Sequence, residues 1–371
     1  MPNSGPLASP ALIRDLAAEA ERRWGDRFLA EPKDAAVAFF SQFGGEHLLA
    51  MIRDDLARFG IVFDSFFSEK DLRARGEVEQ TIALLQSREM LYNHEGARWF
   101  KSTAYGDDKD RALVKSDGEL TYFASDIAYH RNKLERGFKK LVNVWGADHH
   151  GYVPRLKAGL AALGYDPRAL DVVLVQMVQL TRGGEPVRMG KRQGEFVPLS
   201  EVVKEVGKDA ARFFFLMRKS DSHLDFDLEL AKKESSENPV FYVQYAHARV
   251  ASIFEQARQA GVKVEGLSAA KVKLDRLSEP EELSLIKRML EFPEVVEDGV
   301  RELEPHRLVF YLIELAGEFH RYYNRFRVIT DDADLTAARL LLVASVQKVV
   351  GRGLDLLGVA APLKMAARAE P

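Results

Sequence analysis

Apolar residues recur every three or four positions through most of the first hundred residues of this 371-residue chain. That spacing is typical of amphipathic helices, and it predicts three of them, over residues 11–23, 35–59 and 72–86. The pattern stops at a polar stretch, residues 93–96, which has aromatic residues on both sides and predicts a β-hairpin over 90–103. We therefore expect residues 1–103 to be mainly helical.

The middle of the chain carries a different pattern. Apolar runs at residues 141–145 and 172–180 flank a helical pattern at 153–163. A strand, a helix and a strand in this order form a βαβ unit, whose two strands are parallel. Ligands of such sheets gather beyond the carboxyl ends of the strands, so we expect site loops at residues 146–150 and 181–192.

Beyond residue 237 the helical spacing returns and continues almost to the end. It predicts four helices, over residues 240–259, 281–292, 305–326 and 335–357. The stretch 258–280 has the weakest pattern and is expected to be a long connection. Four helices joined in this way predict a bundle, so the fold class is α/β plus all-α.

Composition changes this picture little. The chain is 46% hydrophobic and 29% charged, with a formal net charge of −3, which is typical of a soluble globular protein. It has no cysteine, which excludes disulfides and thiolate zinc sites and suits a reducing cytosol. No apolar run reaches the roughly 18 residues of a membrane span, and no signal peptide is evident. A nucleic-acid partner would need locally basic faces.

The strongest local signal for chemistry is the cationic loop at residues 188–194. Two glycines flank its cations, and the loop leaves a predicted parallel strand. A flexible cationic loop in that position can close on a polyphosphate and stabilise charge that develops during its transfer. The alternative is a solvated basic turn.

The other strand end carries Gly146, Asp148, His149 and His150. Glycine lets a ligand approach the backbone closely, Asp148 can accept hydrogen bonds from ribose hydroxyls, and a histidine can contact substrate. A structural histidine beside an aspartate that caps a helix is the alternative. Adjacent helical side chains point about 100° apart, which disfavours one metal ion held by both rings, so we predict no metal site.

Tyr122, Asp126 and His130 are spaced to share one face if their segment is helical. A phenol beside a carboxylate is a suitable receptor for a guanidinium group, whose planar fork matches a carboxylate. A capping aspartate with a half-buried tyrosine is the alternative.

Two segments of the predicted bundle, residues 241–249 and 319–327, interleave aromatic rings with arginine and histidine. Unstacked RNA bases are held by such combinations, with rings for stacking and guanidinium groups for phosphate. A helical aromatic stripe is also typical of a core, which remains the alternative for these rings.

Taken together, the motifs resemble one family. The segments 145–152, 175–178 and 188–194, followed by 212–217, 221–227, 238–249 and 319–324, occur in the order found in bacterial arginyl-tRNA synthetases. The resemblance extends over residues 54–365. It implies a class I synthetase with a partial Rossmann-type parallel-sheet catalytic domain at 1–236, in which 1–103 is a mainly helical insertion. A helical anticodon-binding domain would then occupy 237–371.

The same resemblance implies the reaction. ATP with Mg²⁺ would convert arginine to arginyl-adenylate, and the arginyl group would then pass to the 3′ end of tRNA(Arg). We expect a cytoplasmic monomer with no membrane partner.

Roles for individual residues also follow from the resemblance. The family's Lys-Met-Ser-Lys-Ser loop falls on the cationic loop, with Arg188 in place of its first lysine, Gly190 in place of its serine and Lys191 matching its second lysine. The implied residues are Arg188 and Lys191 for catalysis; Tyr122, Asp126 and His149 for arginine; Gly146, Asp148, His150, Gln176, Met177, Val178, Met189 and Lys191 for ATP; and Tyr242, Tyr245, Arg249, Tyr323 and Arg327 for tRNA.

One departure bears on activity. The His-x-Gly-His signature of class I synthetases does not occur in the sequence. The expectation is an N-terminally truncated synthetase that is inactive as this chain alone. One alternative is a non-catalytic tRNA-binding paralogue, although the retained Tyr122, Asp126, Asp148 and Lys191 favour the enzyme. Another is a small-molecule nucleotidyltransferase, which leaves the aromatic-rich bundle unexplained.

Overall fold

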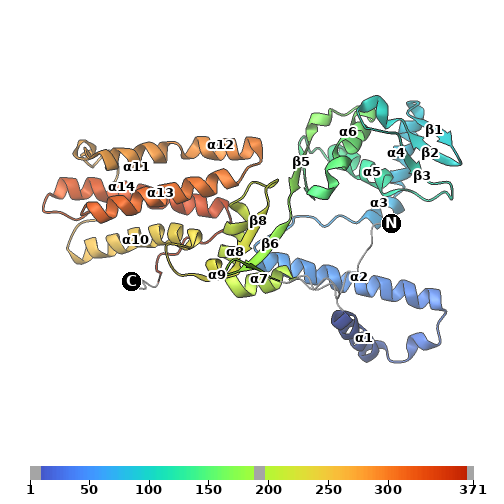
Figure 1. Cartoon of the computed structure of the whole chain (residues 1–371), viewed down its shortest axis with the longest axis horizontal. Coiled ribbons are helices and arrows are strands. Elements are labelled where there is room, and N and C mark those ends of the chain that lie inside the picture. The colour runs from blue at the N-terminus through green and yellow to red at the C-terminus, as the bar shows by residue number, and fades with distance from the viewer. Residues whose placement is uncertain (1–9, 188–196, 366–371) are drawn as a thin grey trace. The chain divides into compact units, whose positions relative to one another are not determined.

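The computed structural model describes residues 10–187 and 197–365. Its contacts divide the chain into two compact units, which we describe separately (Figure 1). The sheet unit comprises Phe63–Val178 and Ser220–Leu224, and the helical unit comprises Met1–Val62, Gln179–Lys219 and Asp225–Pro371.

The sheet unit contains two small sheets and the helices that cover them. Strands β1, β2 and β3 form an antiparallel sheet in that order, and β4 and β5 form a parallel pair. The strands are β1 (Leu91–His94), β2 (Ala97–Phe100), β3 (Arg111–Val114), β4 (Leu141–Gly146) and β5 (Leu170–Val175). The helices are α3 (Glu69–Ala74), α4 (Glu77–Ser87), α5 (Tyr122–Glu135) and α6 (Val153–Ala162), with short 3-10 turns η2 (Ser102–Tyr105), η3 (Ala147–Tyr152) and η4 (Pro167–Ala169).

The predicted βαβ unit is confirmed as β4–α6–β5, with the strands paired in parallel from Leu141 opposite Leu170 to Gly146 opposite Val175. Leu141 on β4 is buried, and α5 and α6 pack closely on the same core. A Cβ atom added to Gly159 of α6 would lie only 2.8 Å from Ile127 of α5, so glycine allows this close approach. The predicted hairpin at 90–103 is also confirmed, as β1 and β2.

Two predicted elements are wrong in their extent. The apolar run 172–180 is not one strand, because β5 ends at Val175 and a separate strand, β6 (Val178–Arg182), begins after Gln176 and Met177. The backbone N–H of Gln176 donates to the carbonyl of Ser220 (2.7 Å), which takes the chain out of the parallel pair. Likewise the predicted helix 72–86 is divided into α3 and α4 by Gly76, whose φ of +70° is left-handed.

The helical unit contains the remaining elements. Its helices are α1 (Pro10–Trp24), α2 (Lys33–Arg58), α7 (Leu199–Val206), α8 (Lys208–Leu216), α9 (Leu228–Lys232), α10 (Pro239–Gln259), α11 (Pro280–Leu290), α12 (Phe292–Glu302), α13 (His306–Arg325) and α14 (Ala333–Leu356), with 3-10 turns η1 (Arg27–Leu29) and η5 (Leu274–Arg276). Strand β6 lies between β7 (Glu185–Pro186) and β8 (Leu224–Asp227), and β8 begins with the last residue of the sheet unit.

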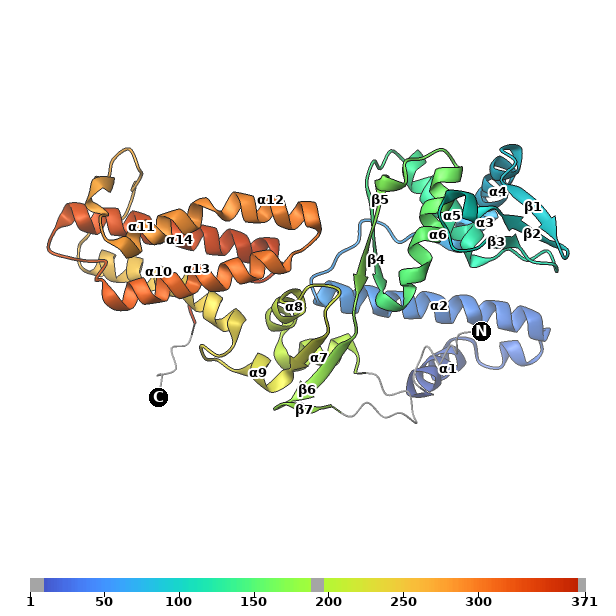
Figure 2. The same cartoon turned by 45° about the horizontal axis from the view of Figure 1, so that its top comes forward.

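Helices α10–α14 form the predicted bundle, in which α10, α13 and α14 lie side by side (Figure 2). Leu312 on α13 fits against Gly353 on α14 so closely that an added Cβ atom would lie 2.6 Å from the leucine side chain. The four predicted helices of this region are confirmed. Helix α12 was missed, because α11 ends just before Phe292-Pro293 and a second helix starts there, with Pro293 in its first turn.

Helices α1 and α2 meet through an aromatic cluster. Trp24 contacts Phe39 and Phe43 with ring centroids 4.8 and 5.0 Å apart, and Phe28 lies 4.4 Å from Phe39. In the described part of the chain, α2 is the helix whose length and composition would suffice to cross a membrane. No residue of α2 is buried, and a single helix of this kind is weak evidence for a membrane span.

One arginine joins three distant segments of the helical unit. Arg212 on α8 donates from Nε to the carbonyl of Leu357 (3.0 Å) and from Nη1 to the carbonyl of Phe59 (3.2 Å). A Cβ atom on Gly358 would lie 2.6 Å from the guanidinium, and Gly358 also has a left-handed φ of +68°. The ends of α2 and α14 are therefore fixed to α8 by a single side chain.

The bundle core also holds a buried ion pair between Glu282 on α11 and Arg339 on α14. Arg339 Nε lies 2.8 Å from Glu282 Oε1, and the Tyr322 hydroxyl donates to the same oxygen (3.3 Å). Both charged side chains are almost inaccessible to solvent. A buried charge that loses its partner costs far more than an exposed one, because no water replaces the lost contact.

We expect Arg339→Met to lower the free energy of unfolding by about 3–5 kcal/mol, since it leaves the Glu282 carboxylate buried without its cation. The matched control is Arg325→Met, which breaks the solvent-exposed pair of Arg325 with Glu281 and should cost about 1 kcal/mol or less. Urea unfolding followed by circular dichroism measures both. Equal losses in the two variants would contradict the assignment of Glu282 and Arg339 as a critical buried pair.

Candidate active site and RNA interface

Helix α5 positions the predicted guanidinium receptor. Thr121 caps its N-terminus by accepting from the backbone N–H of Ala124. The predicted helical spacing is confirmed: Tyr122, Asp126 and His130 follow one another at intervals of one turn. Their surroundings differ strongly, because Tyr122 is 80% exposed, Asp126 is partly buried and His130 is only 4% exposed.

His130 is buried between helix and strand and is electrically neutral. Its Nδ1 lies 2.8 Å from the carbonyl oxygen of Asp126 and its Nε2 lies 2.8 Å from the side-chain nitrogen of Asn143 on β4. A carbonyl can only accept, so Nδ1 carries the hydrogen and Nε2 accepts from Asn143. Burial lowers the pKa of His130 to about 4. The ring therefore connects the backbone at Asp126 to β4 without carrying charge.

The phenol that contacts Asp126 belongs to Tyr152, at the end of η3. The Tyr152 hydroxyl donates to Asp126 Oδ2 over 2.5 Å. The Tyr152 ring lies at edge-on angles to Phe123 (5.9 Å) and Trp145 (5.7 Å), which fixes its direction. Arg155 lies 4.8 Å above the ring. Tyr152 was not among the predicted site residues, although it ends the 145–152 motif.

Tyr122, by contrast, makes no hydrogen bond to Asp126 within the described residues, and its ring points to solvent. Helical spacing alone brings two side chains to one face, but it does not say which of them a third element will cover. The structure thus brings together Asp126 and Tyr152 and leaves Tyr122 as an exposed neighbour one turn away.

The surroundings of Asp126 disfavour the ionised form of its carboxyl group. Burial raises the pKa of Asp126, and the negative charge of Glu69 raises it further. The hydrogen bond from Tyr152 and the charges of Lys133 and His149 lower it, but the net direction is upward. Burial and the proton acceptor Asp126 also raise the pKa of Tyr152, so its hydroxyl stays a donor. A cationic ligand would stabilise this carboxylate, because its positive charge would offset the hydration that burial removes.

The segment after β4 lies open to solvent. Asp148, His149 and His150 are all exposed, and His149 Nε2 lies 3.7 Å from Asp148 Oδ2. A Cβ atom on Gly146 would lie 2.6 Å from Asp148 Oδ1, so a larger residue there would displace the exposed Asp148 side chain. Asp148 makes no capping hydrogen bond to η3, so it is not the helix cap that was the alternative.

The residues predicted beside the adenine follow β5. Gln176 accepts at Oε1 from the backbone N–H of Met177 (3.0 Å), and the Met177 side chain is 75% exposed. Val178 begins β6. The predicted loop residues Arg188, Met189 and Lys191 lie outside the described residues.

In the helical unit, four of the five predicted RNA-binding residues gather on α10 and α13. Arg249 lies 4.5 Å from the ring of Tyr245 and 4.8 Å from the ring of Tyr323. The Tyr242 ring lies 4.6 Å from that of His320, which was not predicted as a site residue. The fifth, Arg327, is exposed just beyond α13.

Two family models match consecutive parts of the chain. Residues 46–242 match the model of the class I tRNA synthetase catalytic domain for arginine, and residues 243–365 match the DALR anticodon binding domain. The chain belongs to the class I arginyl-tRNA synthetase family. Its fold class is accordingly that of a catalytic domain with a parallel sheet followed by a helical anticodon-binding domain, as the sequence predicted.

The relatives cover almost all of this chain. It is 54% identical to the arginine–tRNA ligase of Citrifermentans bemidjiense over 354 residues, which is 95% of this chain and 63% of that protein. The chain thus spans about two thirds or less of the length of the curated relatives it matches. A structure from Campylobacter jejuni assigned as an arginyl-tRNA synthetase superposes with a TM-score of 0.87 at 34% identity, over 96% of this chain and 76% of that one. The Thermus thermophilus enzyme shares the fold, with a TM-score of 0.71 at 22% identity over 96% of this chain and 69% of that one.

The raised pKa of Asp126 predicts a pH-dependent stability difference. Below the ordinary carboxyl pKa of 3.8 the group is neutral in the folded and unfolded chain alike. As pH rises through the higher folded pKa, the folded chain must ionise a buried group, and stability is lost. We therefore expect the free energy of unfolding of the wild type to fall, relative to Asp126→Asn, as the pH rises above the ordinary carboxyl pKa of 3.8.

Urea unfolding of both proteins at each pH measures this difference. The contributions of titratable groups that both proteins share cancel when the two free energies are subtracted. Tyr152→Phe is the companion variant, because it removes a hydrogen bond that favours the charged form and should steepen the fall. A difference that grows in favour of the wild type as pH rises would show that Asp126 is stabilised as a carboxylate.

Proposed function

We propose that this chain provides the arginine-binding and tRNA-binding parts of an arginine–tRNA ligase. The enzyme would use ATP to make arginyl-adenylate and transfer the arginyl group to the 3′ end of tRNA(Arg). The catalytic part would occupy residues 1–236 and the anticodon-binding part 237–371. Its membership of the family supports this proposal, and the Asp126 site supports it in detail.

The observation that carries the proposal is the partly buried Asp126 carboxyl with a fixed hydroxyl on one oxygen. Tyr152 occupies only one lone pair of Oδ2, which leaves Oδ1 and a second site on Oδ2 for a ligand. A guanidinium group can donate to both oxygens at once, whereas an ammonium group cannot do so in one plane. Burial strengthens this preference, because the groups around Asp126 do not fully offset the hydration that its carboxylate loses.

The neighbouring segments supply a place for ATP. Asp148, His149 and His150 follow β4, and Gln176 and Met177 follow β5, whose end is paired with the end of β4. Ligands of parallel sheets bind at this edge. We assign His149 to the arginine side, and Gly146, Asp148, His150, Gln176, Met177 and Val178 to the ATP side.

We assign Met189 to the ATP side as well, and Arg188 and Lys191 to the phosphates, where two cations would offset charge on the leaving pyrophosphate. Mg²⁺ would arrive with ATP. In residues 10–187 and 197–365 no group of three or more histidine, aspartate or glutamate side chains is arranged to bind a metal, so we assign it no protein ligands.

The tRNA would bind the helical unit through Tyr242, Tyr245, Arg249, Tyr323 and Arg327. The ring and guanidinium contacts of this cluster match the stacking and phosphate contacts of single-stranded RNA recognition. We propose that the complete enzyme works in the cytoplasm as a monomer.

We expect the chain to bind arginine, and we expect this binding to weaken when the Asp126 carboxylate is removed. Asp126→Asn should weaken arginine binding by tenfold or more, since a charged hydrogen bond contributes about 1.5–3 kcal/mol. Lysine should bind poorly to the wild type. Isothermal titration with arginine and with lysine measures both.

The two tyrosines give a matched pair of variants. Tyr152→Phe should weaken arginine binding, because it frees the Asp126 carboxylate to rotate, while Tyr122→Phe reports whether the exposed phenol also contacts the ligand. Unchanged arginine affinity in Asp126→Asn would show that Asp126 is not the guanidinium receptor.

Activity is tested separately. We expect the chain alone to form no arginyl-adenylate, because it holds no His-x-Gly-His signature. A chimaera that adds the part of the Citrifermentans bemidjiense enzyme that this chain does not match should exchange pyrophosphate into ATP when arginine and tRNA are present.

In that chimaera Asp126→Asn should raise the arginine KM about tenfold or more and leave the ATP KM within about twofold. A chimaera that binds tRNA but never charges it would favour the non-catalytic paralogue. Robust arginylation by the chain alone would contradict the expected inactivity.

A further inference from the structure

Most of the arginines in the bundle core and on its surface are paired with carboxylates. Arg288 lies 3.0 Å from Glu318 and 3.2 Å from Glu314, Arg339 is paired with Glu282, and Arg325 is paired with Glu281. Arg249 differs. No carboxylate of the described chain lies within ion-pair distance of it, although it is partly buried in α10.

Arg249 is instead held by neutral groups on three sides. Tyr245 and Tyr323 contribute their ring faces, and Nη2 donates to the Tyr245 hydroxyl (3.2 Å). Nη1 lies 3.1 Å from Nδ1 of His320 on α13. These contacts fix the direction of the guanidinium but leave its positive charge without an anion.

The tautomer of His320 follows from its second contact. Nε2 lies 3.1 Å from the carbonyl oxygen of Tyr242, which can only accept, so Nε2 carries the hydrogen. Nδ1 therefore has a free lone pair and accepts from Arg249. Burial keeps the ring neutral by lowering the pKa of His320 to about 4. A protonated ring would repel the arginine that the neutral ring orients.

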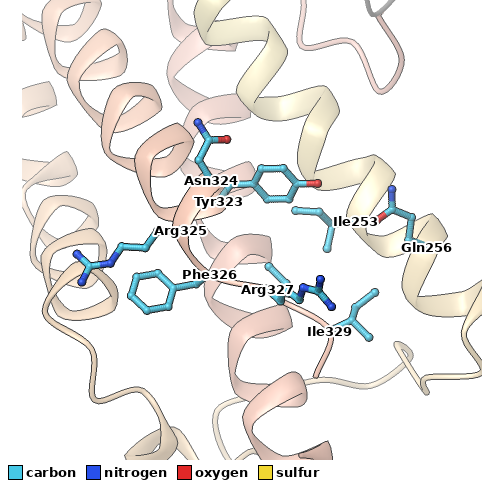
Figure 3. A pocket seen from close by; sticks show the side chains of 9 residues that line it. Ile253, Gln256, Tyr323, Asn324, Arg325, Phe326, Arg327 and Ile329 are labelled. Carbon is cyan, nitrogen blue, oxygen red and sulfur yellow. The ribbon is translucent and has the colours of Figure 1, made fainter. Parts of the chain in front are cut away.

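A pocket of about 530 Å³ lies beside this cluster, between α10 and the chain that leaves α13 (Figure 3). Tyr323 both contacts Arg249 and lines the pocket, and Ile253 on its wall lies one helical turn after Arg249. The lining combines apolar side chains with Gln256, Asn324 and the exposed cation Arg327, whereas the charge of Arg325 is paired with Glu281. An unpaired guanidinium next to a pocket with both apolar and polar walls suits the phosphate and base of one nucleotide.

We propose that His320 is a positioning residue that holds Arg249 between Tyr245 and Tyr323 so that it binds a backbone phosphate of the tRNA beside this pocket. The proposal rests on the tRNA binding proposed above and names the contact within it. His320 is 7% exposed, so it acts through Arg249 and does not itself reach the RNA.

The test uses the full chain and a fluorescein-labelled anticodon stem-loop hairpin of an arginine tRNA. Fluorescence anisotropy gives the Kd at several salt concentrations between about 50 and 200 mM. Arg249→Gln should raise the Kd about tenfold and reduce the slope of log Kd against log salt by about 0.7, the value for one single-strand phosphate contact. His320→Leu should produce most of both changes.

Three comparisons separate positioning from a general structural effect. His320→Gln should restore the wild-type slope, because its amide can donate to the Tyr242 carbonyl and accept from Arg249. His320→Leu added to Arg249→Gln should change nothing further, since the two residues act through one contact. His306→Leu, which removes a histidine from the far end of α13, is the matched control and should leave the slope unchanged.

Each failure has its own meaning. If the wild type does not bind the hairpin, the proposed tRNA binding fails and this contact fails with it. If the wild type binds but His320→Leu keeps its salt slope, His320 does not position Arg249. If His320→Leu does not fold, Arg249→Gln decides, and an unchanged slope in that variant overturns the proposal.

Discussion

A neutral histidine buried between a helix and a strand fixes the geometry on which the proposed arginine site depends. His130 bridges the backbone of α5 at Asp126 and the side chain of Asn143 on β4. Because the His130 ring is buried, breaking either hydrogen bond would leave one of its nitrogen atoms without a partner. The turn after β4 carries Tyr152, so the same strand that holds α5 also delivers the hydroxyl that orients Asp126. A loop-borne carboxylate would have no comparable restraint.

Asp126 also shows what local sequence patterns can and cannot indicate. Helical spacing placed Tyr122, Asp126 and His130 on one face, and the structure confirms that spacing. It did not reveal that β4 would bury His130, or that Tyr152 would cover Asp126. Those contacts join residues 13 and 26 positions apart, and they depend on how a strand and a turn pack on the helix. The motif at 145–152 marked the region but not the role of its last residue.

The fold was predictable where periodicity changes and less so where it continues. The helices of the bundle and the β4–α6–β5 unit have patterns of their own and were found. The end of β5 was missed because apolar residues continue past Val175. The chain leaves the parallel pair where the backbone N–H of Gln176 bonds to Ser220, a contact between distant residues. In the proposed RNA interface the aromatic residues were visible in the sequence. Among the described residues no carboxylate lies beside Arg249, which distinguishes it from paired arginines such as Arg339, and this difference depends on tertiary placement.

The contacts of Arg212 have a consequence for biogenesis. The sheet unit is built from one continuous segment apart from Ser220–Leu224, so most of its contacts can form while later residues are still inside the ribosome. The helical unit is discontinuous, and Arg212 bonds carbonyls 153 positions earlier and 145 positions later. Loops of that length close slowly, and the second bond waits until Leu357 has been translated. During synthesis the end of α2 can therefore be fixed to α8 once Arg212 has emerged, whereas the end of α14 joins them only when the chain is almost complete.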